Sequence, residues 1–550
     1  MAAQAQSAQA QAARARARAR RQAARPPDPQ APATPEEPAR ETELRLVADA
    51  ATFRALASHP LLGPKAPLKW TQQRTVYFDT DGADLQRHGM TLRVRSLRGR
   101  KLLSLKLREG SFDREKIEVR APGEGPQIDL LPPASQELIA AATQARSLAP
   151  RFASQIRRAT RLVAFEGASV EVAFDEGEIV AGAQKAPVRE IELELKSGPP
   201  SSLYRFALAL LEAAPLRLGV ASKADRGAQM LSKRPPQAMR APPPEIEPDV
   251  SLDAATAAML RQCLTHFLGN WDALSSDNAD DSVHQTRVSM RRLRSLLLLL
   301  GRSFPSGEIS GLRAEAKRIA DAFGPARDWR VFADLVENGP AKHLSAPGLA
   351  ALIAEARKRA ALGRSAALAA QADVETTRFV LALQLYIATR GWRNALAEAD
   401  VQELGQPAVA FAARALAATI GKVRKRGRGF EAMPPEARHE LRIALKGLRY
   451  AVDFLGPLFR PTSAVRDYAE KTSALQEMLG AANDTAVAAG LLAQFDTTRQ
   501  PDLAFASGLV LGWCGRASLA DERTLRRAWR RVKKSAPFWQ AAEAPGLQVH

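Results

Sequence analysis

Charged and apolar side chains alternate in several short segments of the N-terminal part of the chain. In ETELRL (41–46), Glu41, Glu43 and Arg45 would share one face of a strand, because successive side chains of a strand point to opposite faces. The same alternation places further acidic and basic groups on strand faces in TLRVRS (91–96), LLSLKL (102–107), VEVAFD (170–175) and REIELELK (189–196). Carboxylate oxygens suit a hydrated divalent cation such as Mg²⁺, whereas Arg and Lys suit phosphate oxygens. Together the segments predict that a metal ion and a polyanion bind side by side.

Each of these segments, taken alone, is also typical of a strand with one solvated face and one buried face. As a set, they combine several carboxylates with several guanidinium and ammonium groups, which favours a common site. A sheet closed into a barrel would turn all the charged faces inward. The result would be a polar tunnel whose apolar outer face is covered by helices.

A second cationic pattern occurs twice, in VHQTRVSMRRLRS (283–295) and RHELRIALKGLRY (438–450). The counterparts lie 155 positions apart (439 − 284 for the histidines), and the matching sets are His284, Arg287, Arg291 and Arg294, and His439, Arg442, Lys446 and Arg449. Residues at i, i+3, i+7 and i+10 lie on one stripe of a helix. A basic stripe is common on a solvated helix, but two with the same spacing predict a duplicated helical bundle. Its pseudo-two-fold axis would merge the stripes into one cationic surface.

The elements that must position these residues change type along the chain, which at 550 residues exceeds a single compact core. Period-two runs predict a strand-rich domain, and a 3.6-residue period after a Pro-rich segment predicts an all-α domain. We predict a disordered basic arm at 1–40, a strand-rich domain at 41–233, a linker at 234–250, a helical domain at 251–537 and a tail at 538–550. A transit peptide is the alternative for the Arg-rich arm, although the arm contains almost no serine.

The composition narrows the classes of partner and compartment. The chain has 79 Lys and Arg against 59 Asp and Glu, so its formal net charge of +20 predicts an anionic partner such as nucleic acid, anionic lipid or another polyphosphate. Cys263 and Cys514 are its only cysteines, which argues against a disulfide framework or a zinc site and favours a reducing, cytoplasmic interior. The longest apolar run, around Leu296–Leu300, is too short to span a membrane.

Six motifs in order make the strand-rich part similar to the CYTH family of triphosphate tunnel metalloenzymes; they are ETELR, YFDT (77–80), the TLRVR and LSLK pair, FDEG (174–177), EIELELK and SKADRG (222–227). The resemblance spans about 41–230 and implies an α+β domain with an eight-stranded antiparallel β tunnel, which binds a triphosphate with Mg²⁺ or Mn²⁺. It implies a catalytic set of Glu41, Glu43 and Arg45. It implies metal ligands at Glu41, Glu43, Asp175, Glu190 and Glu192, and phosphate contacts at Arg93, Arg95, Lys106, Arg161, Lys196 and Lys223. Family members usually have Lys where Arg45 stands, and Arg is bulkier and planar.

The helical part resembles the CHAD domain over about 251–537, through VHxxRVxxRRLRxxL, GxxRD, LRxxLKxLRYxxDF and LQExLGxxND. The resemblance implies a helical domain that often occurs beside CYTH domains and is associated with inorganic polyphosphate. The implied polyphosphate contacts are His284, Arg287, Arg291, Arg292, Arg294, Arg327, His439, Arg442, Lys446 and Arg449. The two histidines are either ligand contacts or packed helix residues. This chain departs from the family pattern at Gly447, where a basic residue is usual, and at Arg330, where Asp is usual.

These features lead to a first hypothesis, a metal-dependent hydrolase of inorganic triphosphate whose helical domain binds polyphosphate, with polyphosphate granules as a candidate location. Thiamine triphosphatase and adenylate cyclase activity in the same tunnel are alternatives within the enzyme class. A second hypothesis is a polyphosphate-granule protein whose tunnel binds without turnover. Nucleic-acid binding comes third, because the basic stripes have little aromatic interleaving for base stacking. The sequence does not define an oligomeric state.

Overall fold

The computed structural model describes residues 39–63, 68–232, 234–242, 246–275, 279–394, 396–496, 498, 500–519 and 522–540. Nearly all of the predicted N-terminal arm therefore lies outside the described residues. The chain divides into two units, Met1–Pro235 and Pro236–His550. Among the described residues, no helix is long and apolar enough to cross a membrane.

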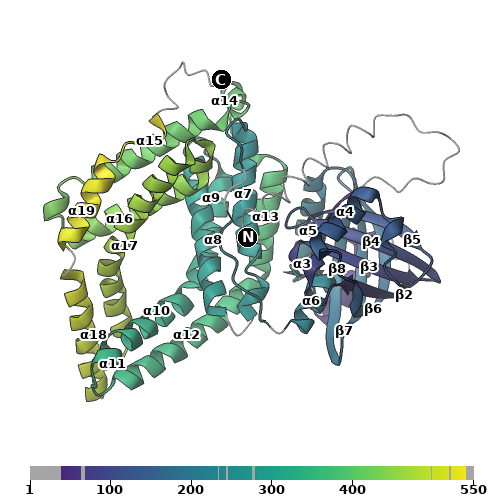
Figure 1. The fold of residues 1–550 in the computed structure, drawn as a ribbon, viewed down its shortest axis with the longest axis horizontal. Coiled ribbons are helices and arrows are strands. Elements are labelled where there is room, and N and C mark those ends of the chain that lie inside the picture. Colours follow the sequence, from purple (N-terminus) through teal and green to yellow (C-terminus); the bar gives the residue numbers. More distant parts are fainter. Residues whose placement is uncertain are drawn as a thin grey trace. The chain divides into compact units, whose positions relative to one another are not determined.

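Eight antiparallel strands of the first unit close into a barrel, as predicted (Figure 1). They are β1 (Ala39–Val47), β2 (Thr71–Asp79), β3 (Met90–Leu97), β4 (Arg100–Arg108), β5 (Asp113–Ala121), β6 (Ala149–Phe165), β7 (Ala168–Ala181) and β8 (Gln184–Ser197). The strand order is β5-β4-β3-β2-β6-β7-β8-β1, and pairing of β5 with β1 closes the ring. The two-residue strand β9 (Arg217–Leu218) extends β1 at its edge.

The apolar residues of this barrel face outward and are covered by helices. Leu92, Val94 and Leu105 pack in one cluster with Leu85 of α3 (Asp84–Arg87) and Ile139 of α4 (Pro133–Thr143). On β1, Leu44 and Leu46 are fully buried on the outer side, and the charged residues between them point the other way. The other α-helices among the described residues of this unit are α2 (Ala50–Leu56), α5 (Pro200–Ala213) and α6 (Lys223–Leu231). The strand alternation thus leaves the interior to the charged side chains.

The second unit is helical and repeats the same order of helices. The first half contains α7 (Leu252–Leu268), α8 (Ala279–Leu300), α9 (Gly307–Ala322), α10 (Gly324–Asn338), α11 (Pro340–His343), α12 (Leu349–Ala372) and α13 (Val374–Ala388). The second contains α14 (Glu398–Leu404), α15 (Ala408–Arg426), α16 (Pro435–Leu455), α17 (Thr462–Leu492), α18 (Pro501–Leu519) and α19 (Glu522–Lys534). The long helix α17 corresponds to α9 and α10 together, which are separate helices where Pro325 removes a backbone donor.

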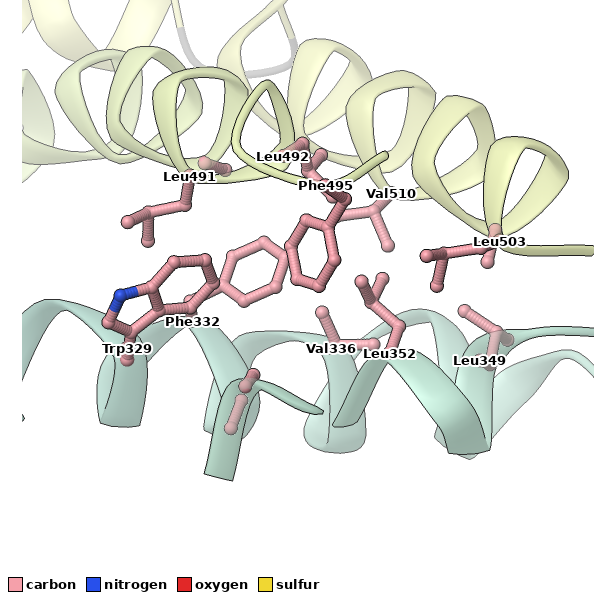
Figure 2. Packing of buried hydrophobic residues seen from close by; sticks show 14 of the residues in the cluster. Trp329, Phe332, Val336, Leu349, Leu352, Leu491, Leu492, Phe495, Leu503 and Val510 are labelled. Atoms are coloured by element: carbon pink, nitrogen blue, oxygen red, sulfur yellow. The ribbon is translucent and has the colours of Figure 1, made fainter. Parts of the chain in front are cut away.

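Contacts between the two halves join corresponding helices: α7 contacts α15, α8 contacts α16, α10 contacts α17 and α12 contacts α18. A pseudo-two-fold axis between the halves produces this pattern, because each element then meets its own counterpart. Figure 2 shows the core at one of these junctions, where Trp329 and Phe332 of α10 pack below Leu491 of α17 and the following Phe495. Trp329 lies edge-on to Phe495, with ring centroids 5.6 Å apart. Large apolar rings therefore join the halves at this end.

Two segments that we predict as a linker and a tail pack on the helical unit. In the first, Met239 donates its backbone N–H to Asn270 and accepts a hydrogen bond from the same amide side chain. In the second, Trp539 is 1% exposed and lies edge-on to Tyr468, with ring centroids 5.2 Å apart. The boundaries at 250 and 537 therefore do not coincide with the limits of packing, because apolar and amide side chains outside the helices complete the core.

Candidate functional site

The barrel interior holds a cavity of about 300 Å³ with a charged wall. Nearly all of the predicted tunnel residues line it, namely Glu41, Glu43, Arg45, Arg93, Arg95, Lys106, Asp175, Glu192, Lys196 and Lys223. Glu190 lies in the same interior, where Lys223 donates a hydrogen bond to its carboxylate. Strand alternation and barrel closure bring these residues together from β1, β3, β4, β7, β8 and α6.

Three carboxylates form a compact cluster on two neighbouring strands. Asp175 of β7 pairs in register with Glu190 of β8, and Glu192 follows two positions later on the same face. One ligand oxygen from each of the three lies within 4.8 Å of the others. We call these three residues the carboxylate cage. Buried carboxylate oxygens so close together are the donor set that Mg²⁺ or Mn²⁺ prefers, so the residues present fit a divalent cation.

Two cations hold the carboxylate cage. The ammonium of Lys223 lies 2.6 Å from Asp175 and 2.8 Å from Glu192, and it also pairs with Glu190. The guanidinium of Arg158 donates from Nε to Asp175 at 2.6 Å and from Nη2 to Glu192. Burial alone would raise the pKa of Glu192, but Lys223 and Arg158 outweigh it and hold that pKa well below its usual range. Burial and the neighbouring Glu192 raise the pKa of Glu190 in spite of Lys223.

Glu41 and Glu43 are placed apart from the carboxylate cage. Lys106 of β4 contacts both, at 2.6 Å from Glu41 and 3.2 Å from Glu43. Burial would raise the pKa of Glu43, but Lys106 overcomes it, with help from Arg45, and brings that pKa far below its usual range. The charges of Glu43 and Glu192 still act on each other. Metal ligation by Glu41 and Glu43 therefore stays a prediction, separate from the three-residue cluster.

Arg45, the residue that departs from the family pattern, binds the side chain of Glu43 on the same strand. Its Nη1 donates to Glu43 at 2.6 Å and its Nη2 donates to the carbonyl oxygen of Val220 at 2.9 Å. The residue is 3% exposed, and its buried Nε has no hydrogen-bond partner among the described residues. A lysine has one ammonium and could not occupy both positions in this planar geometry. Arg45 thus ties β1 to the segment before α6.

Cationic groups crowd the side of the cavity formed by β3. Arg93 and Arg95 alternate on that strand with apolar residues and both line the cavity. The positive charge of Arg93, together with burial, lowers the pKa of Arg95 to about 10. Like charges held this close are stabilised by an anion between them. The wall therefore combines a carboxylate cage with a pair of guanidinium groups that suits phosphate oxygens.

The structure corrects one tunnel prediction and adds a residue. Arg161 does not line the tunnel; it lies on the outer side of the barrel, beside a separate hollow that Trp70 and Arg157 also line. Arg158, three positions earlier on β6, takes the interior position, because it pairs in register with Asp175. The sequence signal for Arg158 was present in IRRATR (156–161), but only the strand register shows which arginine faces inward.

In the helical unit, the two predicted stripes come together where α8 contacts α16. Lys446 of α16 shows their proximity, because burial and the charges of Arg291, Arg442, Arg449 and Arg287 lower its pKa to about 7. Two of these arginines belong to the other helix, so the stripes form one cationic surface. We call the residues His284, Arg287, Arg291, Arg294, Arg327, Arg442, Lys446 and Arg449 the twin-helix surface.

Beside the twin-helix surface, Gly324 and Asp328 are repeated in the sequence as Gly480 and Asp484, 156 positions later. A Cβ atom added to Gly324 would lie 2.8 Å from Nη1 of Arg287, and one added to Gly480 would lie 4.0 Å from Nη2 of Arg442. A side chain at position 324 would therefore crowd Arg287, whereas one at position 480 would make only an ordinary contact with Arg442. Arg287 also lies 3.5 Å from Asp328, the acidic member of the repeated motif. Burial and the cations Arg327 and Arg291 lower the pKa of His284.

Arg292 does not belong to the twin-helix surface, and the prediction that it binds polyphosphate is corrected. It is 7% exposed, lies 3.2 Å from Asp453, and its guanidinium stacks on Phe454 with 4.7 Å to the ring centroid. One residue beyond Arg291 on a helix, a side chain points about 100° away. Arg292 therefore holds α8 against α16. His439 is exposed, unlike the half-buried His284.

Comparison with known proteins gives one match for each unit. The model of the CYTH domain matches residues 39–228, and that of the CHAD domain matches residues 258–493. An uncharacterized protein of Mycobacterium tuberculosis is 27% identical over 326 residues, which are 55% of this chain and 61% of that protein. An inorganic triphosphatase of Haemophilus influenzae is 41% identical over 88 residues, or 16% of this chain and 25% of that protein. The chain thus spans less than two thirds of these curated relatives.

Two solved structures are each similar to part of this chain. The crystal structure of the CHAD domain from the plant Ricinus communis is 28% identical, with a TM-score of 0.47, and covers 54% of this chain and 96% of that chain. A Hippeastrum protein, described as an adenylyl cyclase with a dominant triphosphatase activity, is 20% identical, with a TM-score of 0.26, and covers 34% of this chain and 96% of that chain.

Proposed function

Because the chain consists of a CYTH domain followed by a CHAD domain, we propose that its tunnel hydrolyses inorganic triphosphate, or a related small triphosphate, with Mg²⁺ or Mn²⁺. We propose further that the helical domain binds inorganic polyphosphate. The observation that carries the first proposal is the carboxylate cage in a tunnel whose opposite wall presents Arg93 and Arg95. The relative named inorganic triphosphatase supports the same reaction class.

The roles of the tunnel residues follow from their positions. Asp175, Glu190 and Glu192 would hold the metal, which when bound neutralises phosphate charge and activates water. Arg93 and Arg95 bind phosphate oxygens and stabilise the negative charge that develops on the transferred phosphoryl group. Arg158 orients Asp175 and Glu192, and Lys106 orients the separate pair Glu41 and Glu43. Burial of all these groups strengthens their electrostatic effect on the phosphate.

An inorganic substrate suits the cavity better than a nucleotide. Two of the rings on the cavity wall, Tyr77 and Phe152, stack on each other with centroids 4.6 Å apart, so one face of each ring is already covered. The rest of the wall consists largely of charged side chains suited to phosphate oxygens. Inorganic triphosphate is therefore the favoured substrate, ahead of thiamine triphosphate and ATP.

A second candidate is a binding protein whose tunnel holds triphosphate without turnover. It is favoured by Arg45, whose contacts with Glu43 and Val220 make it a clamp instead of a mobile phosphate contact. In that case both domains would serve to retain phosphate chains.

Phosphate release by the full-length chain distinguishes hydrolysis of triphosphate from binding without turnover. We expect release from inorganic triphosphate in Mg²⁺ or Mn²⁺, slower release from ATP and thiamine triphosphate, and none in EDTA. Arg45→Lys, assayed beside it, reports whether the departure from the family pattern limits the rate. Binding of triphosphate without phosphate release in any metal would establish the binding protein instead, and activity in EDTA would contradict the metal assignment.

The polyphosphate proposal rests on the twin-helix surface and predicts a pH dependence. The pKa of Lys446, lowered to about 7 by burial and four arginines, rises when a polyanion neutralises those arginines. Binding then takes up a proton, so affinity should increase by about tenfold in all as the pH falls from 8 to 6, with most of the gain above pH 7. Isothermal titration in buffers of different ionisation enthalpy measures the uptake.

Lys446→Arg is the matched control for this pH dependence, because arginine keeps the charge but does not titrate in this range. Its polyphosphate affinity should change much less between pH 8 and pH 6. The pKa of His284 is lowered, so this histidine contributes only toward the acid end of the range. An equal pH dependence in Lys446→Arg would assign the proton uptake to another group.

A further inference from the structure

The ammonium of Lys223 occupies the centre of the carboxylate cage. It donates hydrogen bonds to Glu192 at 2.8 Å and to Glu190, and it forms an ion pair with Asp175 at 2.6 Å. The residue is 7% exposed, and its pKa is raised because these carboxylates outweigh the effect of burial. A buried ammonium with three carboxylate partners carries the charge and the contacts that a small cation would have at the same point.

A metal ion held by the same three oxygens would exclude this ammonium. Mg²⁺ takes its ligands at about 2.0–2.1 Å, closer than the nitrogen lies to any of the three carboxylates, and requires its own octahedral space. The two positive charges would also repel each other strongly in a buried site. The cage can therefore hold Lys223 or a divalent cation, but not both in their best positions.

The backbone that carries Lys223 is fixed, so only its side chain can leave. Ser222 caps α6 through a reciprocal pair of hydrogen bonds with Asp225, immediately around Lys223. Four positions further, a Cβ atom added to Gly227 would lie 2.2 Å from the ring of Phe152, so the helix packs closely on β6. The four rotatable bonds of the lysine side chain nevertheless allow the ammonium to swing within the cavity that it lines.

A triphosphate in the tunnel would offer the ammonium new acceptors. Phosphate oxygens beside Arg93 and Arg95 would replace the hydrogen bonds that Lys223 gives up in the cage. The charge arithmetic favours this exchange: three carboxylates face two cations, Lys223 and Arg158, in the tunnel as it stands. When Lys223 moves onto the phosphate, the three carboxylates face only Arg158. The carboxylate cage then carries more of the negative charge that a divalent cation requires.

We propose that Lys223 is a built-in occupant of the metal position, so that the empty tunnel binds divalent metal weakly and metal and triphosphate bind together. The inference rests on the proposed metal site. It makes Lys223 a positioning residue with two alternative partners, the carboxylates in the empty tunnel and the phosphate in the loaded one. In the absence of triphosphate, Lys223 would then exclude free divalent metal from the carboxylate cage.

Titration of the full-length, phosphate-free chain with MnCl₂ tests the proposal. Lys223→Met, which keeps the bulk of the side chain without its charge, should bind Mn²⁺ at least about tenfold more tightly than the unmodified chain. Mn²⁺ should also raise the thermal unfolding midpoint of this variant more than that of the unmodified chain, which shows that the variant is folded. Combining Lys223→Met with Asp175→Asn should remove the gain and so locate it in the cage.

Lys196→Met is the matched control, because Lys196 lines the same cavity but pairs with Glu194 at 2.5 Å and Glu171 at 3.4 Å, outside the cage. Its Mn²⁺ affinity should match that of the unmodified chain. Equal Mn²⁺ affinity of Lys223→Met and the unmodified chain overturns the proposal, as does a gain of the same size in Lys196→Met. Phosphate release by the unmodified chain is measured in parallel. Its absence contradicts the proposed hydrolysis, whereas its presence with equal affinities refutes only the role of Lys223.

Discussion

Replacing Asp175 with Asn is expected to lower the rate of triphosphate hydrolysis by about 100-fold or more. Asp175 is fully buried and is the member of the carboxylate cage that both Arg158 and Lys223 contact at 2.6 Å. The amide keeps the shape of the side chain but removes the negative charge that a divalent cation needs. Phosphate release at saturating Mn²⁺ measures the loss, and the thermal unfolding midpoint reports whether the barrel remains intact.

Glu176→Gln supplies the matched control, one residue along the same strand. Glu176 points to the outer side, where it pairs with Arg157 at 2.9 Å and Arg189 at 3.4 Å. This variant should keep the rate of the unmodified chain, because an exposed ion pair contributes little and lies outside the tunnel. Full activity of a folded Asp175→Asn would remove the carboxylate cage from the mechanism. An equal loss in both variants would indicate a general disturbance of β7.

Reversing the charges of Arg287 and Arg291 together is expected to weaken polyphosphate binding by about 100-fold or more at low salt. Both residues lie on the twin-helix surface, and both act on Lys446 of the opposite helix. Reversing Arg442 and Lys446 should cost about as much, since the two helices contribute corresponding groups to one surface. Affinity for long-chain polyphosphate, measured across a range of salt concentrations, gives both the loss and the reduced salt dependence.

Arg523 and Arg527 allow a control with the same change in net charge. Both are exposed on α19, and neither belongs to the twin-helix surface. Reversing this pair should weaken binding only slightly. A loss as large as that from Arg287 and Arg291 would mean that net charge alone governs binding. Undiminished affinity after reversal of either basic helix would refute the shared surface, and equal competition by duplex DNA would favour the nucleic-acid hypothesis.

Much of the barrel could be predicted from strands with one charged face and one apolar face. Few folds bury the apolar face of such a strand and also give its charged face partners or water. Leu44 and Leu46 had to be buried, so Glu43 and Arg45 had to point the other way, and barrel closure turned them inward. The assignment of Arg161 failed because three arginines stand within five residues of β6. Alternation alone does not say which of them faces inward until the register with β7 is known.

In the helical domain, the spacing of His284, Arg287 and Arg291 predicts a basic stripe, because the helical period depends only on local hydrogen bonds. The merging of two stripes, the lowered pKa of Lys446 and the burial of Arg292 beside Asp453 all required the packing of α8 on α16.

The same division holds in the tunnel. Residue type and alternation were enough to identify carboxylates for a cation and arginines for phosphate. They did not place Lys223 between Asp175 and Glu190, because those residues come from a helix and two strands far apart in the chain. Local periodicity depends on neighbours in sequence, whereas an ion pair depends on which distant surfaces share a space, and that is set when the barrel closes.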